Sequence, residues 1–168
     1  AIFLKNKFPH LSGWVLGSGF AIVYIAALRM HYFSPVPVVT DIIPILVIIY
    51  IVSFALILSG IKWGSIYITA FGFSLGYLSS IIGDNSILIF LTITLLAIQS
   101  AYLKTKLNWN GLFNFTIVTS YLVHLLWFIN NPLVGNQLEL QTGESINLIF
   151  ILIYQIIFTL AYFVDKKY

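Results

Sequence analysis

Long apolar segments separated by short polar links are the feature that most constrains this chain. Six mostly apolar stretches reach the roughly 20 residues that an α-helix needs to cross a bilayer, and they cover residues 11–30, 40–60, 63–83, 86–103, 109–130 and 145–164. Only 8% of the 168 residues are charged, against about 25% in soluble domains. We therefore predict an all-α, polytopic transmembrane helix bundle with six spans and short loops, forming a single domain over residues 1–168.

The links between the segments leave no room for a soluble domain. Thr40 and Asp41 are candidate N-caps for the second segment, since short polar side chains satisfy the free N–H groups of a first turn. Only the link over residues 131–144 is long enough to carry structure of its own. The chain opens on AIFLKNKF, which is similar to the tail of a further apolar segment. We expect the sequence to be part of a longer chain.

Basic residues collect on one side of the predicted membrane. Placing both termini and the links after the second and fourth segments on one side gives that side seven of the eight basic residues: Lys5, Lys7, Lys62, Lys104, Lys106, Lys166 and Lys167. The other side receives Arg29 and four of the five acids: Asp41, Asp84, Glu139 and Glu144. Short basic loops face the cytoplasm, so both termini are predicted to be cytoplasmic, in a bacterial inner membrane. Sidedness accounts for the net charge of +3, and nucleic acid is not expected as a partner.

Tryptophan positions indicate the same topology independently. Trp14, Trp63 and Trp109 each stand near the cytoplasmic start of a predicted outward-going helix, and Trp127 stands near the outer end of the fifth. Indole rings favour both membrane–water interfaces.

The stretch GSGFAI, residues 17–22, begins like a dinucleotide-binding fingerprint. That fingerprint needs a preceding strand and a helix that starts at the loop, whereas these glycines lie inside an apolar run. No cofactor is therefore expected. Gly13, Gly17 and Ala21 are spaced four apart, and small residues at that spacing let helices approach closely in a membrane. We interpret them as a helix-packing seam.

The third segment carries a longer stripe of small residues. Its members follow steps of three and four: Ser65, Thr69, Gly72, Gly76, Ser80 and Gly83. Gly72 and Gly76 form a GxxxG pair, which is typical of helix–helix contacts. We expect Gly72, Gly76, Ser80 and Gly83 to pack against a neighbouring helix. A substrate path with small walls is the alternative. The second segment is mostly Ile, Val, Leu and Phe, and we expect it to face lipid.

A few polar side chains inside the segments are candidates for a functional site: Gln99, Asn114, Tyr121, His124 and Gln155. His124 is the one Asp, Glu, His, Lys or Arg residue placed well inside a predicted helix, and intramembrane ionisable groups often mark function. It is either a hydrogen-bonded neutral imidazole or part of a proton or ligand path. Gln99 and Asn114 are expected to form an interhelical hydrogen bond. Gln155 and Thr159 fit either a structural role or a solute contact.

The sequence contains no pattern expected of a catalytic or metal site. Arg29, His31, Asp41 and Asp84 fall at the outer face, where capping and interfacial solvation account for them, with a shallow polar mouth as the alternative. No pair of carboxylates is spaced for acid–base work, and no Ser-His-Asp or metal-ligand spacing occurs. We expect neither a metal nor enzymatic activity.

The stretches SGWVLGSGFAIVYIAALRMHYFSP and WGSIYITAFGFSLGYLSSIIGD resemble a large bacterial family of multi-spanning inner-membrane proteins of unknown function. Its members show a GxGxAxxY helix, matched here by Gly17, Gly19, Ala21 and Tyr24, and then a small-residue helix with Gly-x-Leu, matched by residues 76–78. The resemblance covers residues 11–130. It implies a longer chain and supplies no catalytic residues.

Three hypotheses about function follow from these features. The first is a structural or interaction module that packs with lipid and with further helices of its own chain or of a membrane-protein partner. The second is a transporter or channel for a small neutral or lipid-like solute, using Gln99, Asn114, Tyr121 and Gln155. The third is a membrane-embedded enzyme whose catalytic groups lie outside this sequence.

Overall fold

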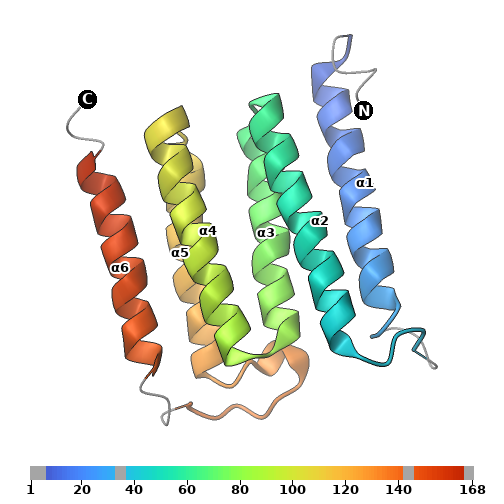
Figure 1. Cartoon of the computed structure of the whole chain (residues 1–168), viewed down its shortest axis with the longest axis vertical. Coiled ribbons are helices and arrows are strands. Elements are labelled where there is room, and N and C mark those ends of the chain that lie inside the picture. Colours follow the sequence, from blue (N-terminus) through green and yellow to red (C-terminus); the bar gives the residue numbers. More distant parts are fainter. Residues whose placement is uncertain (1–6, 33–36, 142–145, 165–168) are drawn as a thin grey trace. The chain divides into compact units, whose positions relative to one another are not determined.

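A computed structural model describes residues 7–32, 37–141 and 146–164 (Figure 1). This part of the chain forms six α-helices and one 3-10 turn, and it contains no strand. The elements are α1 (Pro9–Arg29), α2 (Ile42–Trp63), α3 (Ile66–Gly83), α4 (Ser86–Leu107), α5 (Asn110–Phe128), η2 (Pro132–Val134) and α6 (Ile146–Val164). All six helices are long and apolar enough to cross a membrane. The all-α prediction with six membrane-length helices is confirmed.

The chain divides into two compact units, Ala1–Ser79 and Ser80–Tyr168. The first contains α1, α2 and most of α3, and the second contains α4, α5 and α6. The prediction of a single domain over the whole chain stays a prediction. Lys5, Glu144, Asp165, Lys166 and Lys167, which entered the charge argument, lie outside the described residues.

Helix ends follow from local side-chain and backbone chemistry. Asp41 caps α2, since its Oδ1 accepts a hydrogen bond from the Ile43 N–H at 3.1 Å. Asn85 caps α4 in the same way through the Leu88 N–H at 3.2 Å. Gly64, with φ of 65°, ends α2, and Asn108, with φ of 55°, ends α4. The fourth span was predicted to end at residue 103, but its helix continues for another turn to Leu107.

Close backbone approach joins α2 to α3 in the first unit. A Cβ atom added at Gly60 would lie 2.6 Å from the Thr69 backbone nitrogen, and one at Gly72 would lie 2.9 Å from the Ile57 nitrogen. The Ser53 hydroxyl donates to the Gly72 carbonyl oxygen at 2.8 Å. One side of α2 is therefore buried, and the expectation that this segment faces lipid holds only for its other side, where residues such as Ile51 are exposed.

The predicted seam on α1 lies against α3. Cβ atoms at Gly13 and Gly17 would contact side-chain carbons of Ile68 at 3.5 Å and Phe71 at 3.7 Å. Further along the same helices, the Tyr24 hydroxyl is hydrogen-bonded to Ser79 Oγ at 2.9 Å. Ala21 of the seam is half-buried. Gly17 of GSGFAI thus belongs to a helix contact inside this chain, whereas nothing lies within 4 Å of a Cβ at Gly19. Both glycines lie within α1 and not in a loop.

The remaining packing residues predicted on α3 differ in burial. Gly76 and Ser80 are buried, like Gly72, whereas Gly83 in the last turn is half-buried. A Cβ atom added at Gly72 would come closer than van der Waals distance to the Ile57 backbone nitrogen of α2. The small-residue face therefore serves helix packing at that point.

Aromatic rings hold the second unit together. Phe90 of α4 stacks on His124 of α5, with ring centroids 5.0 Å apart, and on Phe150 of α6, with centroids 4.9 Å apart. Trp127 meets the edge of Phe90 at 4.7 Å and donates its indole N–H to Ser86 Oγ at 2.9 Å. Phe90 has no exposed surface. This ring cluster joins all three helices of the unit.

The link after α5 is built on amide side chains and left-handed backbone. Asn131 (φ 46°) and Asn136 each donate to the Asp84 carboxylate at 2.8 Å, which ties the link to the turn between α3 and α4. Asn130 and Gln141 pair their side chains at 2.8 Å. The described part of the predicted link, residues 131–141, contains the 3-10 turn Pro132–Val134 together with these side-chain bonds.

Candidate functional site

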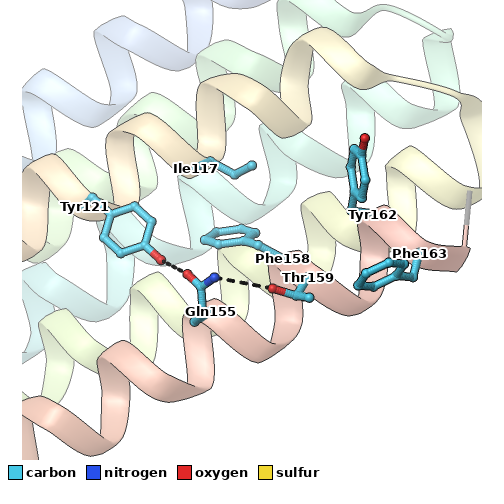
Figure 2. A pocket seen from close by; sticks show the side chains of 7 residues that line it. All are labelled: Ile117, Tyr121, Gln155, Phe158, Thr159, Tyr162 and Phe163. Atoms are coloured by element: carbon cyan, nitrogen blue, oxygen red, sulfur yellow. Dashed lines mark hydrogen bonds between the residues drawn. The ribbon is translucent and has the colours of Figure 1, made fainter.

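An open groove lies between α5 and α6 in the second unit (Figure 2). Its volume is about 330 Å³. Aromatic and aliphatic groups make most of its wall, and four of its side chains carry a polar group: the hydroxyls of Tyr121, Thr159 and Tyr162 and the amide of Gln155. The lining residues are Ile117, Tyr121, Gln155, Phe158, Thr159, Tyr162 and Phe163.

A chain of hydrogen bonds crosses the groove. The Tyr121 hydroxyl on α5 donates to Gln155 Oε1 on α6 at 3.0 Å, and Gln155 Nε2 donates to Thr159 Oγ1 at 3.4 Å (Figure 2). Two predicted site residues, Tyr121 and Gln155, are thus brought together. Each amide nitrogen has two hydrogens and each carbonyl oxygen has two lone pairs. The Gln155 amide therefore keeps one donor and one acceptor position beyond these two bonds.

Gln155 lies at the middle of its helix, nine residues from Ile146 and nine from Val164. At a rise of about 1.5 Å per residue, it is roughly 13 Å from either end of α6. The side chain is exposed. Hydrocarbon offers no hydrogen-bond partner at this depth, so the remaining amide positions of Gln155 can be satisfied only by another polar molecule or protein segment.

His124 lies outside the groove and is held by different contacts. Its Nε2 is hydrogen-bonded to Asn147 Oδ1 of α6, and since a carbonyl oxygen only accepts, Nε2 carries the hydrogen. Its Nδ1 is buried without a hydrogen-bond partner among the described residues. The ring is enclosed by Phe90, Trp127 and Tyr154. These contacts are those of a hydrogen-bonded imidazole, one of the two alternatives that the sequence leaves open for His124.

Gln99 and Asn114 are not brought together. Gln99 Oε1 is buried and has no hydrogen-bond partner in the part of the chain that the structure describes, while Asn114 is exposed on α5. The interhelical hydrogen bond expected between them is therefore not formed. Helix periodicity fixes the face of one helix, but the rotation of α4 against α5 is set by larger contacts such as Phe90 on His124.

Lys104 is a polar residue whose role the sequence reading missed. It was assigned to a cytoplasmic loop, yet it is only 4% exposed in the last turn of α4. Its ammonium group donates to the Ala161 carbonyl oxygen of α6 at 3.1 Å and lies 4.8 Å from the Phe113 ring centre. The spacing from Ala97 and Ser100, both buried, could have revealed this position, since steps of three and four continue one helix face.

The four residues that the sequence predicts at the outer face have separate local surroundings. Asp41 caps α2, and Asp84 anchors the link after α5. His31 bonds through Nδ1 to the Val39 carbonyl oxygen at 2.9 Å, and Arg29 is exposed in the last turn of α1. Among the described residues, no three His, Cys, Asp or Glu side chains are grouped to hold a metal ion.

The chain was compared with protein-family models, with curated proteins and with solved structures. None of the three comparisons found a match.

Proposed function

We propose that this chain is a membrane interaction module: a multi-pass protein of a bacterial inner membrane, with both termini in the cytoplasm, that packs against a further transmembrane helix. The six membrane-length helices support the multi-pass part of this proposal. The lysines of the predicted cytoplasmic links support the orientation. We also propose that the chain belongs to the family of inner-membrane proteins that its sequence resembles.

One observation carries the proposed activity: an exposed, partly satisfied amide at the middle of α6. Gln155 borders a groove whose other walls are mostly apolar, so the groove fits a helix that supplies one polar side chain amid apolar ones. Hydrogen bonds between membrane helices contribute about 0.6–2 kcal/mol each. That contribution adds to van der Waals packing along the groove.

Site-specific photo-cross-linking in native membranes tests this proposal. A photoreactive phenylalanine analogue at Phe163, which lines the groove, should give a protein adduct, and the adduct should decrease in a Gln155→Leu background. Tyr67 of α3 is 85% exposed and serves as the matched aromatic control position. Equal protein adducts at both positions, or none at either, would contradict the proposal.

The orientation has its own test. Reporter fusions after residue 62 and after residue 106 should be active only as cytoplasmic reporters, while fusions after residue 138 should be active only outside. The opposite pattern would reverse the assignment of both termini.

The same groove favours a second candidate, the binding or transport of a lipid-like solute. It contains Tyr121 and Gln155, two of the four residues assigned to such a path, whereas Gln99 and Asn114 are not among its lining residues. A lipid adduct at position 163 that is absent at position 67 and lost in Gln155→Leu would favour this function over the interaction module.

A further inference from the structure

Five exposed residues of α6 form one straight seam, which we call the α6 seam. They are separated by steps of four, three, four and three, and they are Leu148, Leu152, Gln155, Thr159 and Tyr162. This average of 3.5 residues per repeat is the spacing at which two helices pair in a left-handed supercoil. The buried residues of α6, Tyr154, Phe158 and Ala161, lie on a different side of the helix, so the seam remains accessible.

We infer that the α6 seam pairs with the α6 seam of a second copy of this chain, in parallel. This inference rests on the proposed interaction function and names the partner. In a two-fold dimer whose axis is normal to the membrane, every residue meets its own counterpart at the same depth. Gln155, at the middle of α6, then faces Gln155 of the second copy with no adjustment of register.

The amide group makes this pairing electrostatically self-complementary. Gln155 uses one N–H on Thr159 and one lone pair on Tyr121, which leaves one N–H and one lone pair. The partial positive charge of the free N–H on one copy meets the partial negative charge of the carbonyl oxygen on the other. Two symmetric hydrogen bonds form, and both amides are satisfied in surroundings that offer no water.

A single polar residue within an apolar seam also fixes register. A slip of one heptad would place Leu148 opposite Gln155 and Leu152 opposite Thr159, and only the unshifted register brings the two Gln155 amides together. Buried polar residues at single core positions of coiled coils act in this way.

Single-cysteine cross-linking of the full chain in liposomes tests the inference, since the sequence has no cysteine of its own. Leu152→Cys and Thr159→Cys should give homodimers on oxidation. Leu160 is also exposed, but it lies about 100° or more around α6 from Gln155. Leu160→Cys should therefore give no homodimer on oxidation. Gln155→Leu removes both hydrogen bonds of the dimer and should weaken self-association about 10-fold or more, measured by energy transfer between labelled copies at graded lipid dilution. Ile149→Leu, an exposed change away from the seam, should leave it unchanged.

Tyr121→Phe separates the dimer contact from the contact inside one copy. It removes the hydroxyl that bonds Gln155 but leaves the amide, so self-association should be retained or strengthened. Loss of the dimer in Tyr121→Phe, or cross-linking at Leu160→Cys equal to that at Leu152→Cys, would overturn the inference. Adducts at position 163 to a different protein, with no homodimer, would overturn it while leaving the interaction function standing. If position 163 gives no protein adduct and no homodimer forms, both the inference and the proposed interaction function are overturned.

Discussion

The two units solve the same problem, the association of helices in lipid, with opposite kinds of side chain. The first unit uses small residues: Gly60 and Gly72 let α2 and α3 backbones approach within a few ångströms, and Ser53 adds a hydroxyl bond to a backbone carbonyl. The second unit uses large rings and long polar side chains, with Phe90 at the centre and Lys104 reaching α6.

This difference has a physical consequence for tolerance to substitution. Between helices in lipid, van der Waals packing replaces the hydrophobic driving force. Close backbone contact cannot yield when a side chain is added, whereas a ring cluster loses its contacts when a ring is removed. The first unit should therefore be sensitive to enlargement and the second to truncation.

Phe90→Ala should produce the largest effect in the second unit. It removes a fully buried ring that contacts both His124 and Phe150, and truncation of a buried phenylalanine costs about 3–5 kcal/mol of unfolding free energy. Reversible unfolding in mixed micelles measures this loss. Phe115→Ala on α5, where the side chain is exposed, is the control. A similarly small loss of unfolding free energy in both variants would contradict the central role of the ring cluster in stabilising the second unit.

Gly60→Val should be the most damaging enlargement in the first unit. The new Cβ would lie 2.6 Å from the Thr69 nitrogen and 2.9 Å from its Cα, and because these are backbone atoms, the cost should be near the upper end of the usual overpacking range, about 3 kcal/mol. Gly19→Val is the matched control, since nothing lies within 4 Å of a Cβ there. Equal stability of the two variants would contradict the close α2–α3 approach.

Lys104→Met should loosen α6 from α4. It keeps most of the aliphatic volume but removes the bond to the Ala161 carbonyl oxygen, and a hydrogen bond from a charged group contributes about 1.5–3 kcal/mol. Amide hydrogen exchange in the last turns of α6 should rise. Lys106→Met, at an exposed position one half-turn away, should leave exchange unchanged, and an equal rise in both variants would argue against this contact.

Tyr24→Phe should have the smallest effect of the four. It deletes the hydrogen bonds of the hydroxyl to Ser79 Oγ and to the Leu75 carbonyl oxygen, both between α1 and α3, without changing the ring. The loss should be about 0.6 kcal/mol for each bond, the average for interhelical bonds in membranes. Thermal unfolding against the wild type measures it. A loss as large as that of Gly60→Val would mean that hydroxyl bonds, and not close packing, dominate the first unit.

The number of helices and their approximate ends could be predicted from the sequence because apolar length is a local property. The six spans followed from apolar length. The Asp41 cap followed from the preference of short polar side chains for the start of a helix. The polar contacts were harder, since they depend on how far each helix rotates. Gln99 and Asn114 have suitable depths but do not meet, whereas Tyr121 and Gln155, 34 residues apart in sequence, do. The charge of Lys104 indicates a loop, whereas its burial follows from the α4 face that it continues with Ala97 and Ser100.

The anchoring of Asp84 has a consequence for how the link after α5 responds to salt. Its carboxylate is held by the neutral amides of Asn131 and Asn136. Dissolved ions screen the attraction between two separated charges, but they weaken a short hydrogen bond from a neutral donor far less. The link should therefore keep its shape from dilute buffer to high ionic strength.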